Sequence, residues 1–276
     1  MERAHAYIRI QELKDIINEA NRRYYVDNAP VLSDFDFDML LKELEALEQA
    51  FPEYASDDSP TKHVGSDLAS GKASGRSADS RKEFEQHPHR FPMLSLGNTY
   101  DISEVQAFAE RAEKGVGNSF TFSCELKFDG TAICLTYRDG VLFRALTRGD
   151  GTVGDDVTEN VRQIANIPQR LTVPAGFAPT SGEKAPWPQE FEIRGEIYMP
   201  WEAFDRLNVE REKDEEQPFA NPRNAASGSL KLINSAMVAG RGLECTLYHM
   251  LGDNLPFETH DQALKAAQSW GLPVSD

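Results

Sequence analysis

The chain has 276 residues, of which 40% are hydrophobic and 27% are charged, an ordinary composition for a globular protein. Its formal net charge of −16 disfavours a stand-alone nucleic-acid-binding protein, because contacts to phosphates need clustered Lys and Arg side chains. No apolar run approaches the roughly 20 residues of a membrane span, and we expect a cytoplasmic protein that does not enter membranes. The three cysteines form no C-x-x-C pair, which argues against a zinc site or disulfide framework and favours buried free thiols.

Two amphipathic helices are predicted in the N-terminal part of the chain. The first spans 5–28, where apolar residues recur at helical spacing, and Pro30 stops it. Ser33 or Asp34 can cap the second, which spans 34–51 and carries leucines along one stripe. Two helices joined by a short loop predict a small helical hairpin.

The character of the sequence changes after this hairpin. Residues 66–83 are rich in Ser, Gly and charge, and they predict a flexible linker or surface loop. Asp101 and Glu104 have the spacing of a capping box and predict the start of a helix. Strand-like runs follow at 119–127, 131–138 and 141–148.

The rest of the chain mixes strands and helices without the regular alternation of a βαβ fold. Asp139-Gly140 lies between two strand-like runs and predicts a tight hairpin. Asn221-Pro222 predicts an N-cap followed by proline at the first helical position. Further helices are predicted at 155–166, 201–212, 222–233 and 260–270, and strands at 189–199 and 243–250. Antiparallel strands with inserted helices predict an α+β domain.

The stretch CELKFDG, residues 124–130, places a lysine inside a strand-like run. Residues two apart in a strand point to the same face, so Glu125, Lys127 and Asp129 share one. An amine between two carboxylates is either a solvated edge or a functional site. The opposite face is apolar, is expected in the core, and holds Cys124, Leu126 and Phe128.

This stretch resembles motif I of the covalent nucleotidyltransferases, which include DNA ligases, RNA ligases and capping enzymes. In that superfamily the lysine amine attacks the α-phosphorus of a nucleotide and forms a lysyl-nucleotide. A lysine is a nucleophile only when neutral, so a neighbouring cation or desolvation has to disfavour its charged form. Nearby carboxylates can hold Mg²⁺, which neutralises charge on the phosphates.

Seven stretches, in chain order, narrow the resemblance to NAD-dependent DNA ligases of the bacterial type. They are YYVDNAPVLSDFDFD (24–38), DSPTKHVG (58–65), PMLSLGN (92–98), CELKFDG (124–130), TRGDGTVGDDVTENVRQIANIP (147–168), IRGEIYMP (193–200) and FANPRNAASGSLK (219–231). Together they cover nearly the whole chain. The resemblance implies a helical nicotinamide-mononucleotide-binding domain over 1–68. It also implies an adenylation domain, that is, a nucleotidyltransferase with an ATP-grasp-like fold of antiparallel sheets and helices, over 69–276.

The resemblance also implies a set of site residues, with Lys127 as the catalytic nucleophile. The nicotinamide mononucleotide half of NAD⁺ would be bound by Tyr24, Tyr25, Asp34, Phe37 and Asp38. The adenylyl half would be bound by Ser95, Leu96, Glu125, Asp129, Arg148 and Glu196, with Glu125 on adenine and Mg²⁺ near Asp129 and Glu196. Arg223 and Lys231 would lie at the surface that holds nicked DNA.

Three positions depart from the family pattern. Tyr25 stands where some members have histidine, a change that keeps aromatic stacking on nicotinamide. Phe37 stands where many members have tyrosine, and the alternative for it is that it only packs the hairpin. Lys231 replaces an arginine of some members, so a bidentate phosphate contact becomes a point-charge contact.

Full-length members continue beyond the segments found here. A further lysine-bearing strand, an OB-fold, a zinc module, helix–hairpin–helix repeats and a BRCT domain are not in this sequence, and Zn²⁺ would belong only to that part. We therefore expect a monomeric fragment that binds NAD⁺ but does not seal nicks alone. Nicked double-stranded DNA is expected as a partner of the full-length enzyme, and self-adenylation of the fragment is left open.

Two alternatives to this interpretation remain. The first is an ATP- or GTP-using relative such as an RNA ligase or capping enzyme; the segment from Tyr24 to Asp38, which those relatives lack, argues against it. The second is a catalytically inactive NAD-binding module or interaction scaffold, which would bind NAD⁺ without forming an adduct.

Overall fold

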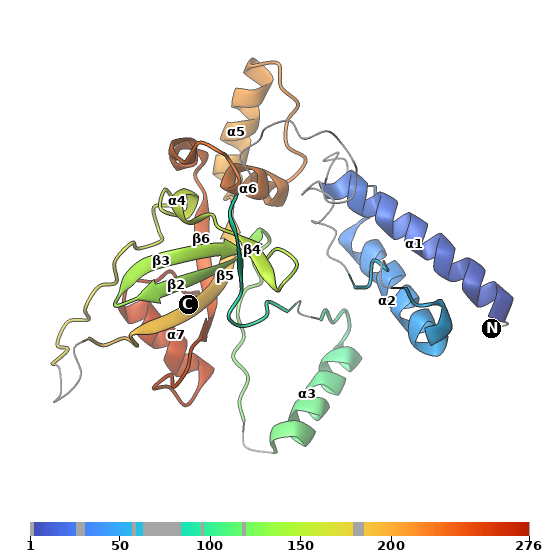
Figure 1. The fold of residues 1–276 in the computed structure, drawn as a ribbon, viewed down its shortest axis with the longest axis horizontal. Coiled ribbons are helices and arrows are strands. Elements are labelled where there is room, and N and C mark those ends of the chain that lie inside the picture. The colour runs from blue at the N-terminus through green and yellow to red at the C-terminus, as the bar shows by residue number, and fades with distance from the viewer. Residues whose placement is uncertain are drawn as a thin grey trace.

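The computed structural model describes residues 3–25, 31–56, 59–62, 84–94, 97–117, 120–178 and 185–275. Within these ranges a pair of helices precedes a mixed region of antiparallel strands and helices (Figure 1). The prediction of an α+β chain with a helical hairpin before antiparallel sheets is therefore confirmed. The predicted linker at 66–83 and the predicted boundary at residue 68 lie outside the described residues.

The helical pair consists of α1 (Arg3–Tyr25) and α2 (Asp34–Ala50). Ser33 is the N-cap of α2, because its Oγ accepts the backbone N–H of Asp36 at 3.1 Å. Lys14 on α1 and Glu48 on α2 form a buried ion pair of 3.3 Å between the helices. The two helices share a small core of their own, made of Ile10, Leu13, Ile17 and Leu44.

A third helix, α3 (Ile102–Val116), lies apart from the sheet in Figure 1. Its N-cap is Asp101, whose carboxylate accepts the backbone N–H groups of Ser103 and Glu104. Glu104 in turn accepts the backbone N–H of Tyr100 at 2.8 Å. The capping signal in the sequence therefore predicted the start of this helix correctly.

The main sheet is antiparallel and has the strand order β3-β2-β5-β6. The hairpin between β2 and β3 turns at Asp139 and Gly140, which have φ of 48° and 74°, the left-handed values that this turn requires. β5 lies at the centre of the sheet, and a bulge in its pairing with β6 leaves Tyr248 without an opposite residue. The strands are β2 (Thr131–Arg138), β3 (Val141–Thr147), β5 (Glu190–Tyr198) and β6 (Glu244–Leu251).

One face of this sheet carries the main core, and the other is polar. Alternate residues of β2 and β5 point to the core, among them Ile133, Leu135 and Ile193. Cys134, Arg194 and Glu196 alternate with them and belong to the opposite face. Helices complete the core: α4 (Thr158–Val161), α5 (Trp201–Lys213), α6 (Pro222–Leu230) and α7 (His260–Ser269).

Two secondary-structure predictions were wrong, and one pair of short strands was not predicted. Residues 120–129 are extended but form no ladder within the described chain, because no described strand pairs with them. Their apolar side chains are consequently not in the core: Leu126 is 75% exposed and Cys124 is exposed. The helix predicted at 155–166 is reduced to α4. Two short strands, β1 (Gln86–Pro88) and β4 (Val153–Asp155), pair with each other and were not predicted.

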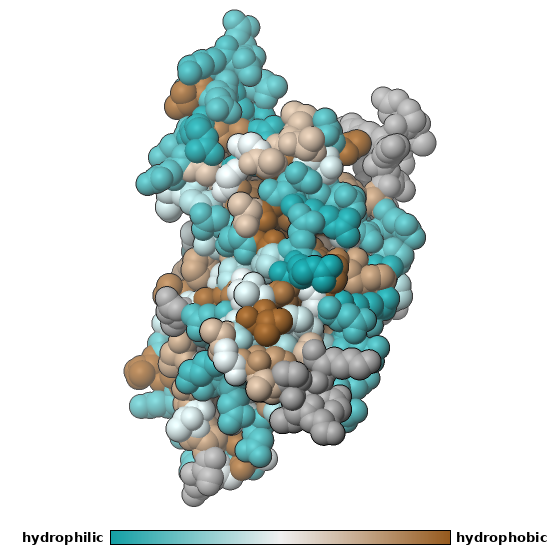
Figure 2. All heavy atoms as spheres, turned by 90° about the vertical axis from the view of Figure 1, so that its left-hand side faces the viewer, coloured by the Kyte–Doolittle hydropathy of each residue, from teal (hydrophilic) through white to brown (hydrophobic). Residues whose placement is uncertain are grey.

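The distribution of hydrophobic residues over the described part of the chain is that of an ordinary globular protein. Among the described residues, no helix combines the length and the apolar character that crossing a lipid bilayer requires. Hydrophobic residues on the face in Figure 2 form separate patches among hydrophilic ones, as on most globular proteins.

Candidate active site

Lys127 lies in the extended segment that leads into β2, and its side chain is exposed. The end of this segment is attached to β5 at two points. The backbone N–H of Gly130 donates to Oε1 of Glu196 at 3.2 Å, and the rings of Phe128 and Tyr198 lie 4.7 Å apart. These contacts place the amine of Lys127 beside the polar face of the sheet.

Glu196 interacts electrostatically with the charged side chains around Lys127, which we call the Lys127 group. Burial raises the pKa of Glu196 to about 7, against the lowering effects of Arg223 and Lys127 and of the Gly130 N–H bond. Asp129, a nearby negative charge, raises this pKa further. Two cationic side chains, Lys127 and Arg223, and two acidic ones, Asp129 and Glu196, therefore lie together where the segment joins β2.

The shifted pKa of Glu196 predicts a pH-dependent stability. The folded state holds the proton more tightly than the unfolded state, so this stabilisation is complete below pH about 4.5. It is lost as the pH rises through about 7, and amounts to at most about 3 kcal/mol. In metal-free buffer, raising the pH from 5 to 8 should lower the urea-determined free energy of unfolding more for the wild type than for Glu196→Gln. We expect Glu196→Gln to gain about 1–3 kcal/mol relative to the wild type over this pH range. If the free energies of unfolding of the two proteins differ by the same amount at both pH values, the raised pKa of Glu196 is contradicted.

Arg223 connects this group to the helical pair. Its Nη1 lies 3.5 Å from Oδ1 of Asp129, and its guanidinium lies 5.7 Å from the ring centre of Tyr24. Next to it, Nδ2 of Asn224 donates to the backbone carbonyl of Tyr24 at 3.3 Å. Tyr24 at the end of α1 and Asp129 therefore contact the same cation, although about a hundred residues separate them in the chain. The resemblance implied Arg223 at a DNA surface; in the structure it contacts Asp129 of the segment that carries Lys127.

Glu125 lies two residues before Lys127 and has partners of its own. Its Oε1 accepts from Nε2 of His260 at 2.9 Å and from Oγ of Ser123 at 3.0 Å. The His249 ring lies edge-on to that of His260, with centroids 6.0 Å apart. Burial lowers the pKa of His249, and His260 lowers it further. His260 was not predicted as a site residue, and only its place after a good N-cap residue, Thr259, marks it in the sequence.

Two further residues of the polar face were also missed. Tyr248, at the bulge of β6, has its pKa raised to about 12 by burial and by Glu196, while Arg194 and Arg148 oppose the shift. This places the Tyr248 phenol near Glu196 and near Arg148, a predicted nucleotide contact. Arg194 is 8% exposed and donates to the carbonyls of Pro92 and Phe91 at 3.0 and 2.5 Å. The available signal for Arg194 was a single basic residue among the alternating acidic residues of β5.

The other predicted residues are dispersed or not described. Asp38 accepts from Nδ2 of Asn98 at 2.6 Å and from the Tyr100 hydroxyl, so it faces the segment before α3. Phe37 packs on the core of the helical pair, which is the alternative role considered for it. Lys231 pairs with Asp155 at 2.9 Å. Ser95, Leu96 and the side chains of Tyr25 and Asp34 lie outside the described residues.

The described residues contain no cluster of three or more His, Cys, Asp or Glu side chains that could hold a metal ion. Mg²⁺ commonly uses one or two carboxylates together with waters and substrate phosphates. Asp129 and Glu196 meet that smaller requirement, because both belong to the Lys127 group. The residues present therefore fit a magnesium ion that a bound nucleotide largely holds.

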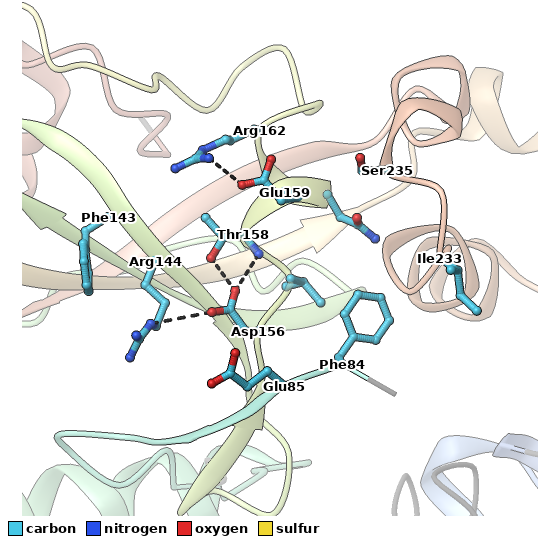
Figure 3. A pocket seen from close by; sticks show the side chains of 12 residues that line it. Phe84, Glu85, Phe143, Arg144, Asp156, Thr158, Glu159, Arg162, Ile233 and Ser235 are labelled. Atoms are coloured by element: carbon cyan, nitrogen blue, oxygen red, sulfur yellow. Dashed lines mark hydrogen bonds and ion pairs between the residues drawn. The ribbon is translucent and has the colours of Figure 1, made fainter. Parts of the chain in front are cut away.

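A separate cavity of about 550 Å³ lies beside α4 (Figure 3). Its two arginines are matched by its own carboxylates: Arg162 pairs with Glu159 at 2.5 Å and Arg144 with Asp156 at 3.6 Å. Among the described residues, those that line it include none of the predicted site residues. The cavity therefore takes no part in the group around Lys127.

Comparisons with known proteins identify the family of both parts of the chain. Residues 3–65 match the family model described as "DNA ligase-like, N-terminal NAD+-binding domain". Residues 81–276 match the model described as "NAD-dependent DNA ligase adenylation domain". Curated DNA ligases of Parabacteroides distasonis and Bacteroides fragilis are 50% and 49% identical over 97% of this chain. That of Cytophaga hutchinsonii is 44% identical over all of it. The chain spans 37–38% of the length of these relatives.

Proposed function

Since the chain belongs to the NAD-dependent DNA ligase adenylation-domain family and carries that family's N-terminal NAD⁺-binding domain, we propose that it performs the adenylation step of DNA ligation. In this step Nζ of Lys127 attacks the adenylyl phosphorus of NAD⁺. A phosphorus–nitrogen bond forms and the bond to nicotinamide mononucleotide breaks. The products are a lysyl-AMP on Lys127 and free nicotinamide mononucleotide.

The observation that carries this proposal is that residues of both matched regions, 3–65 and 81–276, come into contact close to Lys127. Tyr24 from the N-terminal helices and Asp129 next to Lys127 both contact Arg223. A dinucleotide that spans these elements would place one half against the helical pair and the other against the sheet. The positive charges of Arg223 and Lys127 suit the phosphates that join the two halves.

The remaining residues are given the roles that the resemblance to the family implies. We assign Tyr24, Tyr25, Asp34, Phe37 and Asp38 to the nicotinamide mononucleotide half, and Ser95, Leu96 and Glu125 to adenine. Arg148 and Glu196 would position the nucleotide, and the ring of Tyr248 offers a surface for stacking beside them. Bound Mg²⁺ would neutralise phosphate charge. The domain boundary stays a prediction at residue 68.

The activity of the longer protein is a further part of the proposal. In it, AMP would pass from Lys127 to the 5′-phosphate of a DNA nick, and the 3′-hydroxyl would then displace AMP and close the phosphodiester. Arg223 and Lys231 would face the nicked DNA. We propose that the protein is a cytoplasmic monomer.

Intact mass spectrometry tests the donor. After incubation with NAD⁺ and Mg²⁺ we expect the chain to gain the mass of one AMP, and we expect no gain with ATP. A gain with ATP alone would favour the RNA-ligase or capping-enzyme relatives. NAD⁺ binding without a gain would favour a non-catalytic NAD-binding module.

A further inference from the structure

We propose that His260 is a positioning residue for recognition of the adenine base: it holds one oxygen of Glu125, so that the carboxylate presents its other oxygen to the exocyclic amine. This inference rests on the proposed function, in which Glu125 contacts adenine, and it adds a residue from a distant helix to that contact.

His260 is held firmly by its own helix. It is the first residue of α7, directly after the N-cap Thr259, whose Oγ1 accepts the backbone N–H of Gln262 at 3.2 Å. α7 packs on the core through Ala263 and Ala267, which are buried. The edge-on ring of His249 restricts rotation of the imidazole. The Nε2 of His260 is therefore a donor on a rigid element.

The segment that carries Glu125 is attached to β5 at Phe128 and Gly130, which lie beyond Lys127. Residues 120–129 form no ladder within the described chain, so no strand pairing fixes the position of the Glu125 carboxylate relative to the sheet. Ser123 belongs to the same segment and moves with it. The 2.9 Å contact from His260 is the described hydrogen bond that ties Glu125 to the body of the domain.

The hydrogen bond from His260 determines which oxygen of Glu125 can accept a hydrogen bond from adenine. An ionised carboxylate only accepts hydrogen bonds, and both described donors, Ser123 and His260, use Oε1. Oε2 is then the acceptor left for a ligand. Adenine offers an N–H there, whereas hypoxanthine offers a carbonyl oxygen that would repel it. Sites built for one hydrogen bond discriminate strongly against ligands that cannot make it.

The test compares the binding of NAD⁺ with that of its analogue in which hypoxanthine replaces adenine, by isothermal titration calorimetry on the whole chain. We expect the wild type to prefer NAD⁺ by at least roughly tenfold. We expect His260→Ala to reduce this preference to about twofold, mainly through weaker NAD⁺ binding. His260→Gln keeps an N–H donor and should restore the preference. Lys265→Ala, on the exposed side of the same helix, is the matched control and should leave it unchanged.

Testing His260→Ala in a chain already changed at Glu125 distinguishes a positioning role of His260 from an effect on folding. In a Glu125→Ala chain, which has lost both carboxylate oxygens and so has no acceptor for the base, His260→Ala should not change the ratio of NAD⁺ binding to binding of the hypoxanthine analogue further. The inference is overturned if His260→Ala keeps the wild-type preference, if His260→Gln does not restore it, or if the wild type binds both dinucleotides equally. Those results leave the proposed function intact, whereas failure of the wild type to bind either dinucleotide overturns both.

Discussion

Replacing Lys127 with alanine is expected to abolish the AMP adduct that the wild type forms from NAD⁺. The amine of Lys127 is the proposed nucleophile, and no other described side chain of the group around Glu196 can form a stable phosphoramidate. Lys127→Arg should be equally inactive, because a guanidinium stays protonated at any working pH. Intact mass after incubation with NAD⁺ and Mg²⁺ measures the result.

The controls for this variant are direct. Lys127 is exposed, so the alanine variant should unfold in urea within about 0.5 kcal/mol of the wild type. Lys213→Ala removes another exposed lysine, at the end of α5, and should retain the adduct. An adduct that survives in Lys127→Ala would show that another residue is the nucleophile.

Gly130→Ala is expected to slow adduct formation about a hundredfold and to lower stability by about 1–3 kcal/mol. A Cβ at this position would lie 2.1 Å from the carbonyl oxygen of Ile197, so the backbone has to move. That movement also pulls the Gly130 N–H away from Glu196, its acceptor at 3.2 Å. Since Gly130 is three residues from Lys127, the amine shifts with it. The rate of mass gain and the urea midpoint are the two measurements.

Gly115→Ala is the matched control for Gly130. Gly115 lies within α3, and a Cβ there would meet no atom within 4 Å. This variant should keep the wild-type rate and gain up to about 1 kcal/mol from the better helix propensity of alanine. If Gly130→Ala forms the adduct as fast as Gly115→Ala, close packing against β5 is not what positions Lys127.

Local signals in the sequence determined much of the fold. Ser33, Asp101 and Asn221 begin their helices as predicted, because a cap is a hydrogen bond between residues two or three apart. The Asp139-Gly140 turn follows from backbone preferences of those two residues. Motifs along the chain also indicated the family, which the match of residues 81–276 to the adenylation-domain model confirms.

Only the tertiary structure decided which distant residues meet. A strand needs a partner to satisfy its N–H and C=O groups, so the alternating pattern of 120–128 could not by itself make a strand. The contacts of Glu125 with His260 and of Tyr24 with Arg223 join residues more than a hundred positions apart, which no local pattern encodes. The raised pKa of Glu196 likewise depends on burial, and burial is a property of the assembled sheet and of the segments packed against it.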